Sequence, residues 1–244
     1  MREKLEHPVL THLIRSFRNP LLSRKNFLGG CFMKTLMQGF TAVLIVMLFL
    51  AGCSSTPEAA TPEEPGYRIG DTGPGGGIVF YDDSIGISID GKAVKDILPD
   101  GLRYLEAAPP AWSDASAFLW GYYNVDIPGF TFSEDIAGSI GKGRGFSEKI
   151  MAVEPADADS AVQACSAYTG GGMNDWYLPS HGELYVLFLN RDVVGGFQED
   201  YYWSSSAGAD SSSSYAQAVN FEDGWISTDR FRDTAYGVRP IRTF

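Results

Sequence analysis

The chain has 244 residues and a formal net charge of −11, but this charge is distributed unevenly. Of the 19 basic and 30 acidic residues, seven and two lie in residues 1–52, which leaves 12 basic and 28 acidic residues from Cys53 onward. A surface with this excess of carboxylates repels phosphate groups, so nucleic acid is excluded as an expected partner.

An apolar run from Phe40 to Leu50 follows the basic residue Lys34 and precedes Ala51-Gly52-Cys53. The run is too short to span a bilayer comfortably. A basic start, an apolar middle and small residues at the end are typical of a secretory signal. An uncleaved membrane anchor is the alternative. The ending Leu-Ala-Gly-Cys is similar to the lipobox of bacterial lipoproteins, and this resemblance implies that Cys53 carries a lipid.

These features divide the chain into four parts. We expect a non-native or extended leader in residues 1–32, a lipoprotein signal peptide in 33–52, a tether in 53–66 and one domain in 67–244. The tether is rich in Ser, Thr, Pro and Glu and lacks apolar periodicity, so it buries nothing. Ser54, directly after the lipid site, is compatible with sorting to an outer membrane. We therefore expect a lipid-anchored envelope protein that faces outward.

Cysteine usage limits the covalent chemistry of the exported protein. If Cys53 is acylated, Cys165 has no partner for an internal disulfide. Cys165 lies in an Ala-rich helical pattern, which predicts a small buried apolar residue. The domain must then be stabilised by core packing, for which residues 67–244 suffice.

Two extended segments are predicted near the start of the domain. Tyr67 to Tyr81 has β-rich ends around a turn of Gly and Pro, which is typical of a hairpin. The glycines do not indicate a phosphate site, because no Lys-Ser or Lys-Thr follows and a strand comes next. They allow close backbone approach instead. Tyr104 to Pro110 is the second segment, and it stops at its prolines.

Short helices are predicted in the middle of the domain. Residues 111–123 include a candidate helical turn. Ser147 is placed to cap a helix through Met151, and Asp159 to cap a helix over residues 160–168 that ends at Gly170. Asp159 and its neighbour Asp157 do not indicate a calcium loop, because the glycine and the later bidentate acid are missing.

A further helix follows Pro179, which makes the preceding backbone extended. Ser180 and Glu183 have the spacing of a capping box. The next apolar residues are spaced for one helix face, which we expect to pack on the same core as two tryptophans. These residues are Leu184, Leu187, Phe188, Trp176 and Trp203.

The end of the chain is strand-like. Residues alternate from Ala216 to Phe221, and Glu222-Asp223-Gly224 turns the chain back. With Val219 and Phe221 on the buried side, Ala218 is predicted to face the other way.

Motifs spread over residues 67–244 resemble a family of bacterial surface domains with a C-type-lectin fold of the formylglycine-generating-enzyme subclass. The chain looks especially like the variable proteins of diversity-generating retroelements, whose 3′ coding end is rewritten at adenines. The resemblance implies an α+β fold, with short helices around a small antiparallel sheet and much irregular loop. The motifs are Gly70 to Gly77, Ala164-Cys165, Gly171-Gly172, Asp175 to Ser180, Glu183-Leu184, Val194 to Phe197, Tyr202 to Ser206, Asn220-Phe221, Gly224 and Val238 to Arg242.

The resemblance also implies a variable region at about residues 204–242. Randomised Asn codons of the AAC type reach Ser, Tyr, Asp, Gly, Thr, Ala and Phe, but not Lys, Glu, Gln, Met or Trp. Between Ser204 and Tyr236, Gln217, Glu222 and Trp225 fall outside the reachable set; a Ser-rich surface loop would show the same bias. Tyr and Phe bring rigid contact area, while Ser, Asp and Gly adapt their hydrogen bonds. We expect ligand contacts from Asp210, Ser212, Ser213, Ser214, Ala218, Ser227, Asp229, Phe231, Asp233, Thr234 and Tyr236.

Catalysis is not expected from these residues. Formylglycine-generating activity depends on reactive cysteines, which Cys165 alone cannot supply. The Glu-Pro-Asn, Gln-Pro-Asp and Trp-Asn-Asp motifs of calcium-dependent lectins do not occur, and we expect no metal and no cofactor. His181 has no nucleophile placed beside it and is predicted to be a solvated residue at a helix start.

Arg239 and Arg242 have two interpretations. They either contact the ligand or pair with Glu183 or Asp175 and hold the last strand in place. We favour the structural interpretation.

Two functions from different classes follow. The leading hypothesis is a monomeric, lipid-anchored surface protein whose C-terminal segment is diversified to vary its specificity for an extracellular ligand, a protein rather than a small molecule. The alternative is an invariant structural lipoprotein of the envelope with the same fold and no diversified site.

Overall fold

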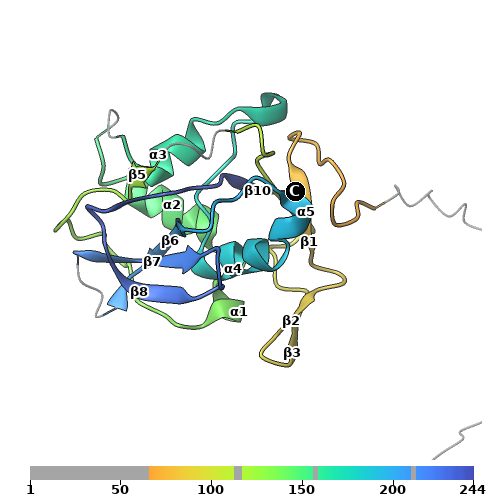
Figure 1. Ribbon diagram of the computed structural model, residues 1–244, viewed down its shortest axis with the longest axis horizontal. Coiled ribbons are helices and arrows are strands. Elements are labelled where there is room, and N and C mark those ends of the chain that lie inside the picture. Colours follow the sequence, from red (N-terminus) through yellow and green to blue (C-terminus); the bar gives the residue numbers. More distant parts are fainter. Residues whose placement is uncertain (1–65, 113–116, 156–158, 210–212) are drawn as a thin grey trace, which may run out of the picture. The chain divides into compact units, whose positions relative to one another are not determined.

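The structure, a computed structural model, describes residues 66–112, 117–155, 159–209 and 213–244 (Figure 1). The predicted leader, signal peptide and lipidation site Cys53 lie outside these residues, as does the tether apart from Gly66. Within the described ranges, no helix has both the length and the apolar character needed to cross a bilayer.

Short helices and small antiparallel sheets make up the described chain, which confirms the predicted α+β class. The strands are β1 (Ile78–Asp82), β2 (Ile87–Ile89), β3 (Lys92–Val94), β4 (Tyr104–Ala107), β5 (Phe118–Leu119), β6 (Tyr201–Ala207), β7 (Tyr215–Asn220), β8 (Ile226–Phe231), β9 (Ala235–Tyr236) and β10 (Ile241–Thr243). The helices are α1 (Ile136–Ser139), α2 (Gly143–Met151), α3 (Ala161–Ser166), the 3-10 helix η1 (Gly170–Gly172), α4 (His181–Leu189) and α5 (Arg191–Val194).

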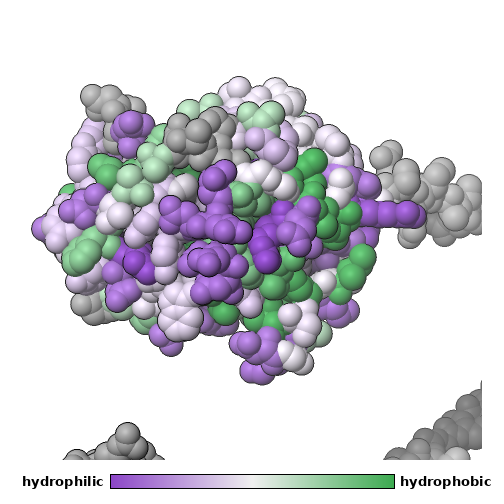
Figure 2. Space-filling model, viewed as in Figure 1, coloured by the Kyte–Doolittle hydropathy of each residue, from purple (hydrophilic) through white to green (hydrophobic). Residues whose placement is uncertain are grey.

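Two three-stranded sheets organise the domain. In the first, the order is β1-β4-β10, so the end of the chain pairs with an early strand. In the second, the order is β6-β7-β8, a meander with β7 at its centre. Helix α4 packs against strands of both sheets. The remaining strands form the two-stranded pairs β2-β3 and β5-β9. Seen from the same side, the surface is a mixture of hydrophilic and hydrophobic side chains (Figure 2).

A buried carboxylate explains the glycine-rich turn before β1. Gly75 and Gly77 each donate a backbone N–H to Glu106, with N···O distances of 2.9 Å. A Cβ atom at Gly77 would lie 2.5 Å from a carbonyl oxygen of β4, so a side chain does not fit there. An isolated bridge joins Thr72 to Ile78. The predicted hairpin is therefore present as a tight turn with a single bridge.

Arg242 completes the environment of Glu106. Its Nη1 donates to Glu106 Oε1 at 2.8 Å, and its Nε donates to Asp175 Oδ1 at 2.7 Å. Glu106 is fully buried and Arg242 is 7% exposed. Because charged hydrogen bonds are strong when they are shielded from water, this group fastens β10 to β4. The structural interpretation of Arg242, with Asp175 as its partner, is confirmed.

Arg239 is also structural, but its partners differ from those predicted. It is fully buried and donates to the carbonyl oxygens of Ala108 and Gly196, at 3.0 and 2.7 Å. The prediction of Glu183 as a partner of either arginine is wrong. Glu183 accepts the backbone N–H of Ser180 in its own capping box and that of Gly141.

Two predicted helix starts are corrected by the structure. Helix α2 begins at Gly143, so Ser147 lies in its middle and donates to the carbonyl oxygen of Leu178 at 3.0 Å. Helix α3 is capped by Ser160, not by Asp159, since the Ser160 hydroxyl accepts the N–H of Gln163. In the described part of residues 111–123, the regular element is strand β5 and not a helical turn.

The capping box of α4 is confirmed, with both reciprocal hydrogen bonds between Ser180 and Glu183 present. The prediction that His181 is solvated is wrong, because α1 packs against the start of α4 and leaves His181 2% exposed. Its Nδ1 lies 3.0 Å from Ser206 Oγ, and its Nε2 lies 3.4 Å from Ser139 Oγ. Burial lowers the pKa of His181 to about 4.

The β6-β7-β8 sheet separates two hydrophobic clusters. One cluster contains Leu184, Leu187, Tyr202, Val219 and Phe221. The other contains Trp120, Val162, Cys165, Trp203 and Ala218. The apolar face of α4 packs into a core as predicted. Trp203, however, belongs to the second cluster and not to the cluster that contains the α4 residues. Cys165 is fully buried, as predicted.

Strand β7 therefore has no solvent side. Ala218 pairs with Trp203 on β6 and with Ser227 on β8, and it is 0% exposed. The alternation predicted for this strand is real, since Val219 and Ala218 belong to different clusters. The conclusion that Ala218 faces a ligand is wrong, because the second face of the strand is covered as well.

We predict that Glu106→Gln lowers the free energy of unfolding by about 3 to 5 kcal/mol, because it leaves a buried arginine without its full partner. The matched control is Lys95→Ala, which removes an ion pair to Asp96 between side chains that are 54% and 68% exposed. The control should cost less than about 1 kcal/mol. Urea unfolding of both variants measures the difference, and equal small losses would contradict the role given to Glu106.

We also predict a pH-dependent contribution from His181. The unfolded chain takes up this proton below a pH of about 6.5, whereas the folded chain takes it up near pH 4. Stability from the neutral ring is therefore fully present above pH 6.5 and is lost as the pH falls to 4. Over this range the wild type should lose about 3 kcal/mol more than His181→Asn.

Denaturant unfolding of both proteins between pH 7 and pH 4 measures this effect. Burial also raises the pKa of Glu183, to about 6, but Glu183 titrates in both proteins and cancels in the difference. A difference in unfolding free energy that stays constant with pH would show that His181 is not held neutral by the fold.

Candidate ligand-binding face

Strand β8 is the edge of its sheet, and the segment that ends it alternates in charge. Asp229, Phe231 and Asp233 are exposed. Arg230 is half-buried and Arg232 is 2% exposed. Successive side chains of a strand point to opposite sides, so Arg230 points away from Asp229 and Phe231. Arg232 and Asp233 follow β8 in a turn, in which Arg232 is buried and Asp233 is exposed.

Both arginines are held by aromatic rings. The Arg230 guanidinium lies 3.9 Å from the ring centroid of Tyr201 and donates to its hydroxyl. The Arg232 guanidinium lies 4.3 Å from the ring centroid of Trp120. Arg232 also donates to the carbonyl oxygens of Val125 and Tyr215, at 3.1 and 3.0 Å. Burial lowers the pKa of Arg232 to about 10, so it stays charged at neutral pH.

Arg232 thereby fixes the 121–125 loop beside the end of β8. The ring centroids of Phe231 and Tyr215 lie 4.8 Å apart, and those of Phe231 and Tyr123 lie 6.4 Å apart. Asn124 accepts a hydrogen bond from the Ser214 hydroxyl at 2.7 Å, and its N–H donates to the carbonyl oxygen of Ser213. The loop and the predicted variable region thus form one surface.

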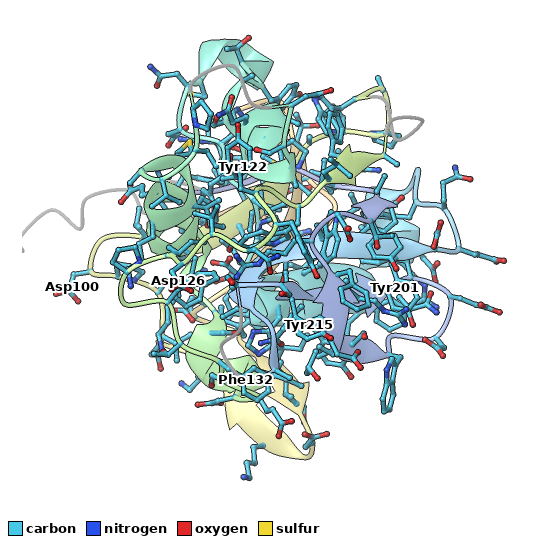
Figure 3. The ribbon with its side chains drawn as sticks, turned by 90° about the vertical axis from the view of Figure 1, so that its left-hand side faces the viewer. Asp100, Tyr122, Asp126, Phe132, Tyr201 and Tyr215 are labelled. Atoms are coloured by element: carbon cyan, nitrogen blue, oxygen red, sulfur yellow. The ribbon has the colours of Figure 1, made fainter. Side chains whose placement is uncertain are left out.

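This surface is called the β8 face below. Figure 3 views the side of the molecule on which Tyr215 lies near the centre, with Tyr122 and Asp126 contributed by the loop. Tyr122 is 44% exposed, Tyr123 is 41% and Phe231 is 47%. The β8 face consists of Tyr122, Tyr123, Asp126, Tyr215, Asp229, Phe231 and Asp233.

The loop residues were not among the predicted contacts. Their signal in the sequence is the pair Tyr122-Tyr123 between Gly121 and Asn124, two exposed aromatics in a turn-like setting. That signal does not specify where the loop packs, because the connection to β8 depends on Arg232, which is more than a hundred residues away in the chain.

The predicted contact residues separate into three groups. Asp210 and Ser212 lie outside the described residues. Ala218 and Ser227 are buried, at 0% and 4% exposure, so neither offers a surface to a ligand. The prediction for Ser227 fails because its side chain is buried: it pairs with Ala218 on β7, and its hydroxyl donates to Asp229 Oδ1 at 2.9 Å. The accessible group contains Ser213, Ser214, Asp229, Phe231, Asp233, Thr234 and Tyr236.

Tyr236 is partly buried in the core and partly accessible to solvent. It is half-buried, and its ring centroid lies 4.8 Å from that of Trp203 and 5.3 Å from that of Tyr201. It pairs with Phe118 across the short β5-β9 ladder. Tyr236 therefore covers the second cluster while its remaining surface stays accessible.

Three cavities of the described chain lie apart from the predicted contact positions. One, of about 430 Å³, is lined by residues 191–192, 195–199 and 221–222. Another, of about 150 Å³, is lined by residues 69, 80–82, 85–87 and 190. The third, of about 40 Å³, is lined by His181, Ser206, Gln217, Lys142 and their neighbours. The third is close in size to one or two water molecules, so it does not offer room for a substrate. In the described ranges, no cluster of three or more His, Cys, Asp or Glu side chains is arranged to hold a metal ion.

The fold and the β8 face together define a small α+β domain that presents polar and aromatic side chains on an edge strand and a neighbouring loop. The chain belongs to the Lcl C-terminal domain family, whose family model matches residues 112–242. The match contains the whole β8 face and supports a variable-protein identity. Comparison with curated proteins finds no match.

Proposed function

We propose that this chain is a ligand-binding variable protein with a C-type-lectin-like fold of the formylglycine-generating-enzyme subclass. Its segment from about 204 to 242 is diversified by a retroelement, and a lipid on Cys53 holds it at the outer surface of the cell envelope. Membership of the Lcl C-terminal domain family supports the variable-protein part of this proposal.

The proposal rests on one observation: within the variable segment, one strand is buried and the next presents side chains to solvent. Strand β7 is buried between two clusters, while β8 and the residues after it present Asp229, Phe231 and Asp233 to solvent. Side chains on an exposed edge are replaced at little cost in stability, because few packed atoms are lost. Such an edge suits a protein whose contact residues change while its fold stays constant.

The position of the β8 face also supports outward display. In Figure 1 the described chain begins on the right, near β1 and β10, whereas the ends of β5, β7 and β8 lie on the left. Tyr67, at this beginning, packs its ring against those of Tyr104 and Phe244. The described chain therefore begins on the side away from the β8 face.

We further propose that the protein binds its ligand stoichiometrically and is not an enzyme. The Cys165 thiol is fully buried and its pKa is raised well above the ordinary value, so it is a poor nucleophile. His181 is enclosed between two serine hydroxyls, and its pKa is lowered to about 4. Both groups are explained by packing, and neither adjoins the β8 face.

The nucleotide sequence around the coding region tests the retroelement part directly. We expect a nearby near-copy of the 3′ coding end that differs mainly at adenines, together with a reverse transcriptase gene. Differences should concentrate in the codons of exposed positions such as Asp229 and Phe231. The lack of such a repeat would favour the invariant envelope lipoprotein instead.

A stability experiment tests whether the face is free to vary. The variant combines Ser213→Tyr, Asp229→Asn, Phe231→Ser and Asp233→Ser, all at accessible positions. Asp229 is changed to Asn because an amide oxygen still accepts the hydrogen bond from the buried Ser227 hydroxyl. Because each surface change costs at most about 0.5 kcal/mol, we expect the melting temperature to fall by less than about 8 °C in total.

The matched control is the single variant Ala218→Tyr, in the same segment but in the core. Overpacking there should lower the melting temperature more than the four surface changes together, because β7 has no free side to receive the ring. The idea of a rigid base with an independent face fails if the fourfold variant unfolds and the control does not.

A further inference from the structure

The β8 face carries one sign of charge. Residues 117–135, 198–209 and 213–238 form the face and its surroundings, and they contain two basic residues, Arg230 and Arg232. Lys149 of α2 also reaches these segments, with its Nζ 3.0 Å from the carbonyl oxygen of Gly129. Arg232 is buried against Trp120, and Arg230 is half-buried against Tyr201. The same segments contain the acidic residues Asp126, Glu134, Asp135, Glu199, Asp200, Glu222, Asp223, Asp229 and Asp233.

Inward-facing arginines leave the outer surface without their charge. Arg232 is 2% exposed and is surrounded by carbonyl oxygens and an indole ring. The Asp229 and Asp233 side chains lie on the opposite, exposed side of the same segment. Carboxylates in a locally anionic field attract cations and repel anions at the stage of encounter.

The aromatic side chains of the face also favour a positively charged ligand. Tyr123, Tyr215 and Phe231 form a contiguous group of rings between the carboxylates. The negative face of an aromatic ring attracts Lys and Arg, and such contacts strengthen when they are shielded from water. A flat surface of exposed tyrosine and phenylalanine also matches the anchors that proteins use to bind other proteins.

We infer that the β8 face binds a cationic protein surface, in which Lys or Arg side chains pair with Asp229 and Asp233 while their aliphatic stems lie on Phe231 and Tyr123. This inference rests on the proposed ligand-binding function and specifies the class of its ligand. The basic partner is chosen over an anionic membrane or a nucleic acid because the same carboxylates repel phosphate groups.

The test uses the full-length chain and a phage-displayed library of random linear peptides as the probe. We expect the enriched peptides to carry a net positive charge, with Lys or Arg next to apolar residues. Synthetic copies of the enriched peptides should bind more weakly as salt rises from about 20 mM to about 300 mM, because screening shortens the range of charge attraction. Enriched peptides that are neutral or acidic would overturn the inference.

Charge-neutral substitutions locate the binding. The double variant Asp229→Asn and Asp233→Asn keeps side-chain size, and we expect it to weaken binding of the basic peptides about tenfold or more. The matched control is Asp100→Asn with Glu148→Gln, which removes the same charge at exposed positions elsewhere; Asp100 stands well away from Tyr215 in Figure 3. Equal losses for the two double variants would indicate attraction by net charge alone and would overturn the inference.

A third variant separates this inference from the proposed function. Phe231→Ala removes the central ring and leaves both carboxylates in place. If peptides of any charge bind, and binding falls with Phe231→Ala but not with the Asn variant, the ligand-binding face stands and the cationic partner is rejected. If the library yields no peptide sensitive to any of these changes, both the face and its partner are rejected.

Discussion

The burial of β7 on both faces is the constraint on which the rest of the structure depends. Val219 packs toward α4 and Ala218 packs toward Trp203, so neighbouring residues of one strand belong to different clusters. Protein interiors are close-packed, and a strand held in this way tolerates little change in side-chain volume. The substitutions that this fold tolerates are consequently those on β8, the edge of the sheet, and in the turns beside it.

The arginines of β8 show how one short segment serves both the interior and the surface. Arg230 and Arg232 place their guanidinium groups on aromatic rings and on backbone oxygens. These contacts, together with the backbone ladder to β7, bind β8 to the sheet and to the 121–125 loop. The outward residues have fewer contacts: Asp229 accepts one hydrogen bond from the Ser227 hydroxyl, and the Phe231 ring packs on that of Tyr215. The inward side chains of this segment therefore hold the framework rigid, while the outward side chains can be replaced.

Local patterns in the sequence predicted the elements that depend on local interactions. The capping box of Ser180 and Glu183 is a contact over three residues, and it is present as expected. Predictions failed where a distant segment decides the outcome. His181 is buried because α1 covers it, and Ala218 is buried because a second cluster covers β7. The part played by Tyr123 was not predictable for the same reason, since a hydrogen bond across more than a hundred residues places its loop.

The proposed diversification has a consequence for how specificity changes between variants. Asp and Arg are both reachable from a randomised AAC codon, whereas Glu and Lys are not. The charge at outward positions such as Asp229 and Asp233 can therefore reverse by base changes that leave the framework untouched. Trp225, which is 65% exposed, and Gln217, which is buried, fall outside the reachable set and stay constant under the same process. Under the proposed diversification, the β8 face of each variant would define its ligand, while the buried β7 and the inward arginines would be common to all variants.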